Sequence, residues 1–368
     1  MQCSLVVIFK ASETEGRCLM AFNRTDMETA PRVSIIILNW NGWQDTIECL
    51  ESVYNISYPN YDVIVVDNGS EDKSIAKIKA YADGNIRINS KFFEYSKIKK
   101  PIRVIEYLFN EIEPNGGERI EIDAIPPHKR LILIKCEKNY GFAEGNNIAI
   151  RYSLKILKPQ YVLLLNNDTV VDQQFLSELV FSSLNEENCG ICGSKLYFYA
   201  HSEVIQSAGG KINWLLGNVD QIGYRKKDQN DYSSVSDVDT VSGCSMLINH
   251  SLIGKIGLLN SELFAYYEDT DYCVRAQKNG YRVIFVPNSK VWHKVSGTSR
   301  KTSGLREYYS MRNLVWFVKT YSQSYYLFLL YLLFFKIWFN CAVITLYHRN
   351  PSALRGYFYG VYDGLFSH

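Results

Sequence analysis

The segment that most constrains the fold is a short apolar run that ends abruptly in polar residues. Tyr161 to Leu165 are all apolar, and Asn166, Asn167 and Asp168 follow directly. Such a run is typical of a strand covered on both faces, as in a parallel sheet. Ligands of open α/β sheets bind at the carboxyl ends of these strands, where a carboxylate such as Asp168 suits a hard divalent cation. The alternative is that the polar residues only form a turn.

The same pattern occurs twice nearer the amino terminus. Segments 33–38 and 61–66 are rich in apolar residues, and each is followed by polar residues, its polar tip. A predicted helix follows each of these tips. Repetition of strand and helix predicts an α/β fold with a mainly parallel central sheet. We expect the tips Asn39, Asp67 and Asp168 to converge on one crevice.

Residues from about 84 to 130 interrupt this alternation. They are rich in charge and contain adjacent glycines and adjacent prolines. We interpret them as a surface insertion with a short helix near Arg103 to Phe109. It is either a solvated excursion or a contact for a partner or acceptor. Residues 1–30 carry no strong pattern and are predicted to be a loosely ordered tail.

Two more segments place polar residues at predicted helix starts. Lys138 and Asn139 precede a glycine-containing helix start, whose free N–H groups suit a phosphate or a base. The sequence has neither GxGxxG nor GxxxxGK[ST], which excludes a dinucleotide fingerprint and a P-loop. Glu268, Asp269 and Asp271 follow an aromatic run. The helix dipole explains acidic residues there, but a carboxylate at the mouth of an apolar pocket also suits a general base.

Composition narrows the class of protein. The 40 basic and 38 acidic residues nearly cancel, which argues against a nucleic-acid binder. The spacing of the nine cysteines does not resemble a disulfide framework. Cys189 and Cys192 form a single CxxC motif without a second one, which favours buried thiols over a zinc site. A reducing compartment that faces the cytosol is the simpler interpretation.

The carboxyl-terminal region is strongly apolar from Tyr325 to Tyr347, interrupted by Lys336, Asn340 and Thr345. A spanning helix needs ~20 apolar residues, so the length suffices. A charge at mid-span costs roughly 3 kcal/mol or more, however, and dense aromatics fit the interface better. We predict that residues 301–368 are helical and associate with the cytoplasmic face of the cell membrane, lying on its surface. A single spanning helix and a buried helix pair are the alternatives.

Several segments together carry a resemblance to a known family. From about Arg32 to Arg312 the chain resembles inverting glycosyltransferases of family 2, in particular the rhamnosyltransferase-like branch that builds surface polysaccharides and lipid-linked glycans. The resemblance, which excludes the insertion, implies a GT-A catalytic domain over residues 31–300. The helical apolar extension of residues 301–368 would follow this domain. The segments that carry it are VSIIILNWNG, VIVVDNGSEDKS, EKNYGFAEGNN, LLLNNDT, SGCSMLI, FAYYEDTDYCVRAQKNGYRV and VWHKVSG.

The resemblance also implies roles for residues on the nucleotide side. Asp67 would meet the nucleotide base, near Asn39 and Asn41. Lys138 and Asn139 would flank the nucleoside.

Metal and catalytic roles follow from the same resemblance. Asn166 and Asp168 match the first and last places of the family's DxD motif, so Asp168 would carry the charged metal contact alone. His293, which the residues alone favour as structural, matches a further metal ligand. Asp269 matches the catalytic base. Glu268 and Arg312 would contact substrate, and Asp271 would cap the helix or touch the acceptor.

The implied reaction moves a sugar from a UDP- or dTDP-sugar to a glycan or lipid-linked acceptor by one inverting displacement, assisted by Mg²⁺ or Mn²⁺. The polar, basic loop from Ser296 to Lys301 would either fold over the diphosphate as a lid or be an ordinary exposed loop. One alternative is a sugar-phosphate nucleotidyltransferase, which should show a loop rich in glycine and arginine where Asn39 to Gly42 stand. The other is a catalytically silent scaffold that binds nucleotide sugars. Such a scaffold is expected to lack the acidic pair, whereas Glu268 and Asp269 are present here.

Overall fold

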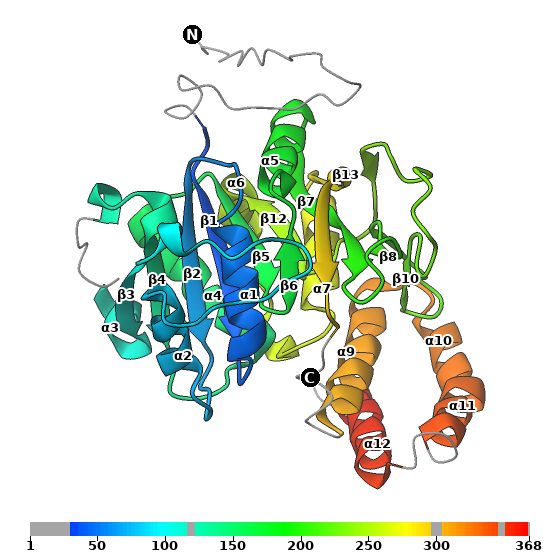
Figure 1. Cartoon of the computed structure of the whole chain (residues 1–368). Helices are drawn as coiled ribbons and strands as arrows, with labels where there is room; N and C mark the ends of the chain where they lie inside the picture. Colours follow the sequence, from blue (N-terminus) through cyan, green and yellow to red (C-terminus); the bar gives the residue numbers. More distant parts are fainter. Residues whose placement is uncertain (1–29, 116–121, 296–303, 345–349, 367–368) are drawn as a thin grey trace.

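The computed structural model describes residues 30–115, 122–295, 304–344 and 350–366. One large sheet runs through the molecule with helices on both of its faces, and a group of helices from the carboxyl-terminal region lies beyond one end of the sheet (Figure 1). The predicted tail, apart from Ala30, and the predicted lid lie outside the described residues.

The sheet confirms the prediction of a mainly parallel core. Its strand order is β11-β13-β7-β12-β5-β1-β2-β4-β3, with β6 paired to β13 and β8 to β7. The five strands from β5 to β3 are parallel to one another, and β13 is parallel to β7. The strands are β1 Val33–Asn39, β2 Tyr61–Asp67, β3 Arg103–Leu108, β4 Arg130–Lys135, β5 Tyr161–Asn166, β6 Thr169–Val171, β7 Cys189–Phe198, β8 Ile205–Ser207, β9 Gly210–Ile212, β10 Val219–Gln221, β11 Ser236–Asp237, β12 Ser245–Asn249 and β13 Arg282–His293.

Helices cover both faces because successive side chains of each strand point to opposite sides. Ile35 and Ile37 pack in one core with α1, α2 and α5, whereas Ile36 packs in the other with α4, α6 and α7. The helices are α1 Trp43–Val53, α2 Ser74–Ala82, α3 Phe109–Asn115, α4 Gly141–Tyr152, α5 Phe175–Asn185, α6 His250–Ile256, α7 Glu268–Lys278, α9 Leu305–Tyr321, α10 Tyr325–Tyr331, α11 Ile337–Ala342 and α12 Pro351–Phe366.

The prediction of a short helix near Arg103 to Phe109 is wrong. Residues Arg103–Leu108 form β3, an edge strand parallel to β4, and α3 begins only at Phe109. Ile105 and Tyr107 point into the core while Glu106 and Leu108 are exposed, which is the period of a strand. The first part of the same region also packs on the sheet, because Phe92 stacks on Trp292 of β13 with ring centroids 4.5 Å apart. The segment is therefore integrated into the domain.

The carboxyl-terminal region is helical where it is described. Residues 325–342 form a continuous run of α10, a π-helical turn and α11. This run is 18 residues long with a mean hydropathy of 1.5, enough by length and composition to cross a membrane, and 11% of it is buried inside the protein. A row of glycines, Gly356, Gly360 and Gly364, lets α12 approach the backbone of α9, since an added Cβ at each would meet α9 or Gly304 just before it.

Candidate functional site

The tips of β1 and β2 lie side by side, as expected for neighbouring parallel strands, and form one hydrogen-bonded cluster. Asn39 pairs with Asp67 across the two strands, and its Nδ2 donates to Asp67 Oδ2 at 2.8 Å. The Asn39 Oδ1 accepts from Thr46 Oγ1 at 2.7 Å. Ser70 N donates to Asp67 Oδ1 at 3.1 Å. The Asp67 carboxylate is thus held in place at the carboxyl edge of the parallel strands.

Asn41 organises the loop that follows β2. Its Oδ1 accepts from the backbone N–H groups of Glu71 and Asp72, and its own N–H donates to Ser70 Oγ at 2.9 Å. Asn41 therefore fixes the shape of this loop through contacts with backbone N–H groups and with Ser70. Ser70 was not singled out from the sequence, although it stands in the quoted segment VIVVDNGSEDKS.

Asn68 and Gly69 connect the loop after β2 to Lys138 and Asn139, the predicted nucleoside residues. Asn68 Nδ2 donates to Asn139 Oδ1 at 2.9 Å, and its Oδ1 accepts from Tyr140 N at 3.0 Å. Gly69 has φ of +72°, and a Cβ there would lie 2.6 Å from the Cα of Lys138. Only glycine fits this close approach. The structure therefore brings Lys138 and Asn139 beside the Asp67 cluster, and Lys138 is exposed there.

The amino terminus of α4 differs from the expectation that it offers free N–H groups. The carbonyl oxygen of Phe264 accepts from Phe142 N at 2.6 Å and from Ala143 N at 3.1 Å. The helix start is therefore capped by the segment that leads to Asp269. Nothing local in the sequence signals this contact, since the partners lie far apart in the chain.

Asp168 and His293 lie side by side at the carboxyl edge of the sheet. His293 pairs with Thr169 between β13 and β6, and His293 Nε2 lies 3.1 Å from Asp168 Oδ1. The distance is that of a hydrogen bond between the imidazole and the carboxylate. Both groups are also ligand types for a divalent cation, which would replace this hydrogen bond when it binds. The other ring nitrogen, Nδ1, contacts Gln206 Oε1 at 3.0 Å, which orients the imidazole.

The surroundings of His293 are polar and charged. Burial alone would lower the pKa of His293, but the neighbouring Cys244 and the Asp168 carboxylate raise it well above its ordinary value. No group of three or more His, Cys, Asp or Glu side chains suited to a metal occurs in the part of the chain that the structure describes. A cation here would therefore depend on diphosphate oxygens and water for its other ligands.

Cys189 and Cys192 take no part in the Asp168–His293 arrangement. Both are buried in β7 with their sulfur atoms 3.3 Å apart, as predicted for buried thiols.

Lys294 adds a cationic group that the sequence analysis did not single out. Its Nζ lies 2.6 Å from Asp45 Oδ1 and 2.6 Å from Glu48 Oε2 on α1. Its backbone N–H donates to Asp168 O at 3.0 Å, which ties the end of β13 to the turn after β5.

Asp269 lies at the start of α7 with its carboxylate held by backbone donors. Its Oδ2 accepts from Gly243 N at 2.9 Å, and its Oδ1 accepts from Thr270 N at 2.7 Å. Burial raises the pKa of Asp269, and these hydrogen bonds offset part of the rise. Cys244 directly follows Gly243, and its backbone carbonyl oxygen accepts from Asn166 N at 3.0 Å. Two adjacent residues before β12 thus link the Asp269 carboxylate to the turn that carries Asp168.

Glu268 and Asp271, the acidic neighbours of Asp269, have different surroundings. Asp271 pairs with Arg275 at 2.9 Å and accepts from Tyr321 Oη at 2.5 Å, which makes it a structural residue. Glu268 is the first residue of α7. It is only 6% exposed, and burial followed by the charge of Asp269 raises its pKa well above the ordinary value. Arg312 donates to the carbonyl oxygens of Glu262 and Leu263. The expected substrate contacts of Glu268 and Arg312 stay predictions.

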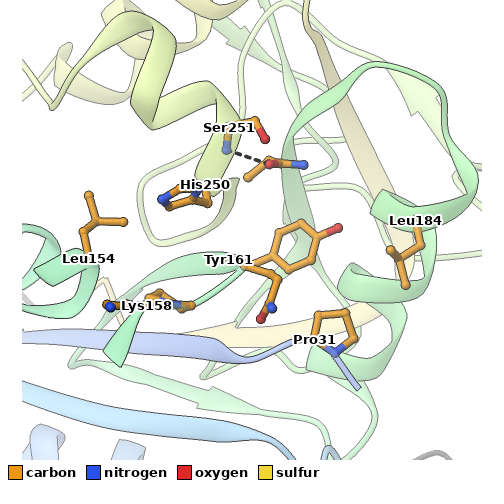
Figure 2. Close-up of a pocket in the computed structure, with 10 residues that line it drawn as sticks. Pro31, Leu154, Lys158, Tyr161, Leu184, His250 and Ser251 are labelled. Carbon is orange, nitrogen blue, oxygen red and sulfur yellow. Dashed lines mark hydrogen bonds between the residues drawn. The ribbon is translucent and has the colours of Figure 1, made fainter. Parts of the chain in front are cut away.

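A separate hollow of about 560 Å³ lies at the opposite edge of the sheet. Figure 2 shows Tyr161, the first residue of β5, and Lys158, His250 and Ser251 around it. Its lining residues include no carboxylate, and none of the predicted site residues is among them. The hollow is therefore separate from the candidate site.

Comparison with known families gives two matches. Residues 34–97 match the model for glycosyl transferase family 2, and residues 161–360 match that for glycosyl transferase family group 2. The second match covers more than half of the 368 residues.

Curated relatives include a hexosyltransferase and a rhamnosyl transferase. The low-salt glycan biosynthesis hexosyltransferase Agl10 of Haloferax volcanii is 28% identical over 158 residues, 42% of this chain and 49% of that protein. The dTDP-rhamnosyl transferase RfbF of Shigella flexneri is 26% identical over 199 residues, 52% of this chain and 64% of that protein. The matches thus span less than two thirds of these relatives.

Solved structures show the same fold at low identity. The mannosyltransferase PcManGT from Pyrobaculum calidifontis, in complex with GDP-Man and Mn²⁺, has a TM-score of 0.52 at 14% identity, covering 91% of this chain and 87% of that one. GalNAc-T7 with UDP, GalNAc and Mn²⁺ has a TM-score of 0.53 at 14% identity, covering 81% and 49%. The likeness confirms the predicted GT-A fold.

Proposed function

The chain belongs to glycosyl transferase family 2, and from this premise we propose that it transfers a sugar from a UDP- or dTDP-sugar to a hydroxyl group of a glycan or lipid-linked acceptor, with inversion. The relative RfbF, named as a dTDP-rhamnosyl transferase, supports this class of donor. We further infer a role in the synthesis of cell-surface polysaccharide or glycoconjugate.

The donor nucleotide would bind at the tips of β1 and β2. The Asp67 carboxylate is already oriented by Asn39 and by Ser70 N, so it is ready to accept from a base. The contacts of Asn68 bring Asn139 and the exposed Lys138 to the same edge. A nucleoside would then lie between the loops after β2 and β4.

Asp168 and His293 would hold a divalent cation, Mn²⁺ or Mg²⁺, together with the diphosphate of the donor. Bound there, the cation would neutralise the negative charge that develops on the leaving diphosphate. Asn166, at the end of β5, would line the same edge. The proximity of the Asp168 carboxylate and the His293 imidazole, two suitable ligand types, supports this assignment.

Asp269 would act as the general base. Its carboxylate takes the proton from the acceptor hydroxyl while that oxygen forms a bond to the anomeric carbon. The bond from this carbon to the diphosphate oxygen breaks at the same time, so the configuration inverts. The observation that carries the proposal is the link through Gly243 and Cys244, because it joins the Asp269 carboxylate to the Asp168 turn.

The test is a transfer assay on a panel of donors. UDP-N-acetylglucosamine, UDP-glucose, GDP-mannose and dTDP-rhamnose would be incubated with Mn²⁺ and membrane lipid extract, and release of nucleoside diphosphate measured. We expect Asp269→Asn to bind UDP or dTDP but to lose transfer, whereas Asp271→Asn, two residues away, keeps transfer.

Other outcomes of this assay would support other functions. Binding of a panel donor without turnover by the unmodified protein would favour a silent scaffold. Release of pyrophosphate from a nucleoside triphosphate and a sugar phosphate would favour a nucleotidyltransferase. Near-normal transfer by Asp269→Asn would remove Asp269 from the role of base.

We also propose that the carboxyl-terminal helices bind the cytoplasmic face of the cell membrane. The run from α10 to α11 exposes large apolar side chains, among them Trp338 at 71%. Helix α12, at the far end of the molecule in Figure 1, exposes Tyr359, Tyr362 and Phe366. Rings of this kind favour the interface between lipid and water.

Co-sedimentation with vesicles of phosphatidylglycerol and phosphatidylcholine tests this attachment. Replacing Phe334, Phe335, Trp338 and Phe339 by serine should release the protein into the supernatant. Replacing the exposed Tyr224, which lies on another part of the chain, should not. Unchanged sedimentation of the fourfold variant would refute attachment through these helices.

A further inference from the structure

The segment that leads to Asp269 has an unusual backbone. Phe264, Tyr266 and Tyr267 have φ of +61°, +72° and +71°. Residues with a Cβ rarely adopt this left-handed region, and such conformations persist only where the surroundings impose them. Three of them within four residues mean that other elements must hold the 263–267 segment in place.

Asn313 of α9 holds the 263–267 segment through three hydrogen bonds. Its side-chain amide Nδ2 donates to the carbonyl oxygens of Leu263 at 2.8 Å, Ala265 at 2.9 Å and Tyr266 at 2.7 Å. Asn313 is 0% exposed, so water cannot replace these bonds. The carbonyl groups of the left-handed turn converge on one point, and a single amide nitrogen occupies it.

Neighbouring contacts fix the position of this amide. Asn313 Oδ1 accepts from Arg312 Nε at 2.9 Å, and Arg312 Nη2 donates to Glu262 O at 2.6 Å. On the other side, Phe264 O caps α4 through Phe142 N and Ala143 N. The 263–267 segment is therefore held between α4 and α9, immediately before the first turn of α7.

We propose that Asn313 is a positioning residue that sets the place of the Asp269 carboxylate by fixing the backbone of the 263–267 segment. The inference rests on the proposed role of Asp269 as general base. Asp269 follows Tyr267 by two residues, so a change in the left-handed turn rotates the start of α7. The distance between the carboxylate and the acceptor hydroxyl changes with it, and a shift of about 1 Å is enough to slow such a reaction by about 100-fold.

Two substitutions separate positioning from simple packing. Asn313→Asp keeps the size and polarity of the side chain but, when ionised, has no hydrogen to donate to the three carbonyls. Asn313→Ala removes the amide altogether. We expect both variants to lower kcat at least tenfold on the most active donor of the panel. The KM for that donor and the affinity for UDP or dTDP with Mn²⁺ should change less than threefold, because Asp67 and Asp168 lie on other elements.

Asn147→Ala is the matched control. Asn147 is also buried, and its amide exchanges hydrogen bonds with both backbone groups of Leu259, outside the left-handed segment. This variant should lose stability while keeping kcat within threefold of the unmodified protein. Hydrogen exchange should become faster in residues 263–268 of the Asn313 variants and remain slow there in Asn147→Ala.

The results distinguish this inference from the proposed function. If Asp269→Asn is inactive but Asn313→Asp keeps kcat and slow exchange in residues 263–268, Asn313 does not position the base. A fall in kcat of Asn147→Ala as large as that of the Asn313 variants would also overturn the inference. If Asp269→Asn itself keeps transfer, the proposed base is wrong, whatever the Asn313 variants do.

Discussion

Substituting alanine for Gly360 tests the contact between α12 and α9. A Cβ at Gly360 would lie closer than 3.0 Å to the carbonyl oxygen of Tyr308, and 3.0 Å from its carbonyl carbon. Both are backbone atoms, which cannot rotate away as the end of a side chain can. Helix α12 would have to move off α9, and overpacking of this kind costs about 1–3 kcal/mol.

The intrinsic helix preference acts in the opposite direction. Alanine stabilises a helix interior by about 1 kcal/mol relative to glycine. Gly254 in α6 offers the matched control, because nothing lies within 4 Å of a Cβ there. Gly254→Ala should therefore gain about 1 kcal/mol, and Gly360→Ala should lose up to ~2 kcal/mol. The difference between the two isolates the steric cost.

Hydrogen exchange measures both effects locally. The free energy of opening of the α12 amides should fall in Gly360→Ala, and that of the α6 amides should rise in Gly254→Ala. If Gly360→Ala stabilised α12 as much as Gly254→Ala stabilises α6, the close backbone contact would not exist in solution.

Three further predictions concern the site. Asp168→Ala should abolish the Mn²⁺-dependent part of UDP or dTDP binding in calorimetry, and unchanged metal-dependent affinity would remove Asp168 from the metal site. Asp271→Asn should lower the free energy of unfolding by about 1–3 kcal/mol, since Arg275 loses its charged partner, and an unchanged denaturant midpoint would contradict this. Burial raises the pKa of Asp269, so the base becomes protonated as pH falls through a value above the ordinary ~3.9, and kcat/KM should decline there; an acid limb at the ordinary value would argue against this base.

The strand tips could be predicted because their signals are local. Asn39, Asp67 and Asp168 each follow an apolar run, and parallel strands bring their carboxyl ends to one edge. The strand Arg103–Leu108 also had a local signal, since Val104, Ile105 and Tyr107 are residue types common in strands. The charged residues around it obscure this period, which is why the sequence wrongly favours a short helix there.

The contacts that orient the site had no local signal. Asn313 binds carbonyl groups 47 to 50 residues away, and Phe264 caps a helix more than 120 residues earlier in the chain. A backbone carbonyl can be supplied by any residue type, so side-chain patterns do not identify it. The left-handed conformations of Tyr266 and Tyr267 are equally hidden, because glycine, asparagine and aspartate are the residues that normally mark that region.

Helix α9 connects the exposed aromatic surface with the predicted base. The glycines of α12 contact Gly304, just before α9, and Tyr308 and Arg312 within it. Asn313 binds the 263–267 segment from the same stretch. At its other end Tyr321 binds Asp271 in α7. The contacts between α12 and α9 are between backbones, which leave no flexible side chain to absorb a displacement. Helix α9 holds the start of α7 through the side chains of Asn313 and Tyr321, so we expect α12 and the start of α7 to move with α9. Attachment of α12 to a lipid surface would therefore fix the direction from which an acceptor reaches Asp269.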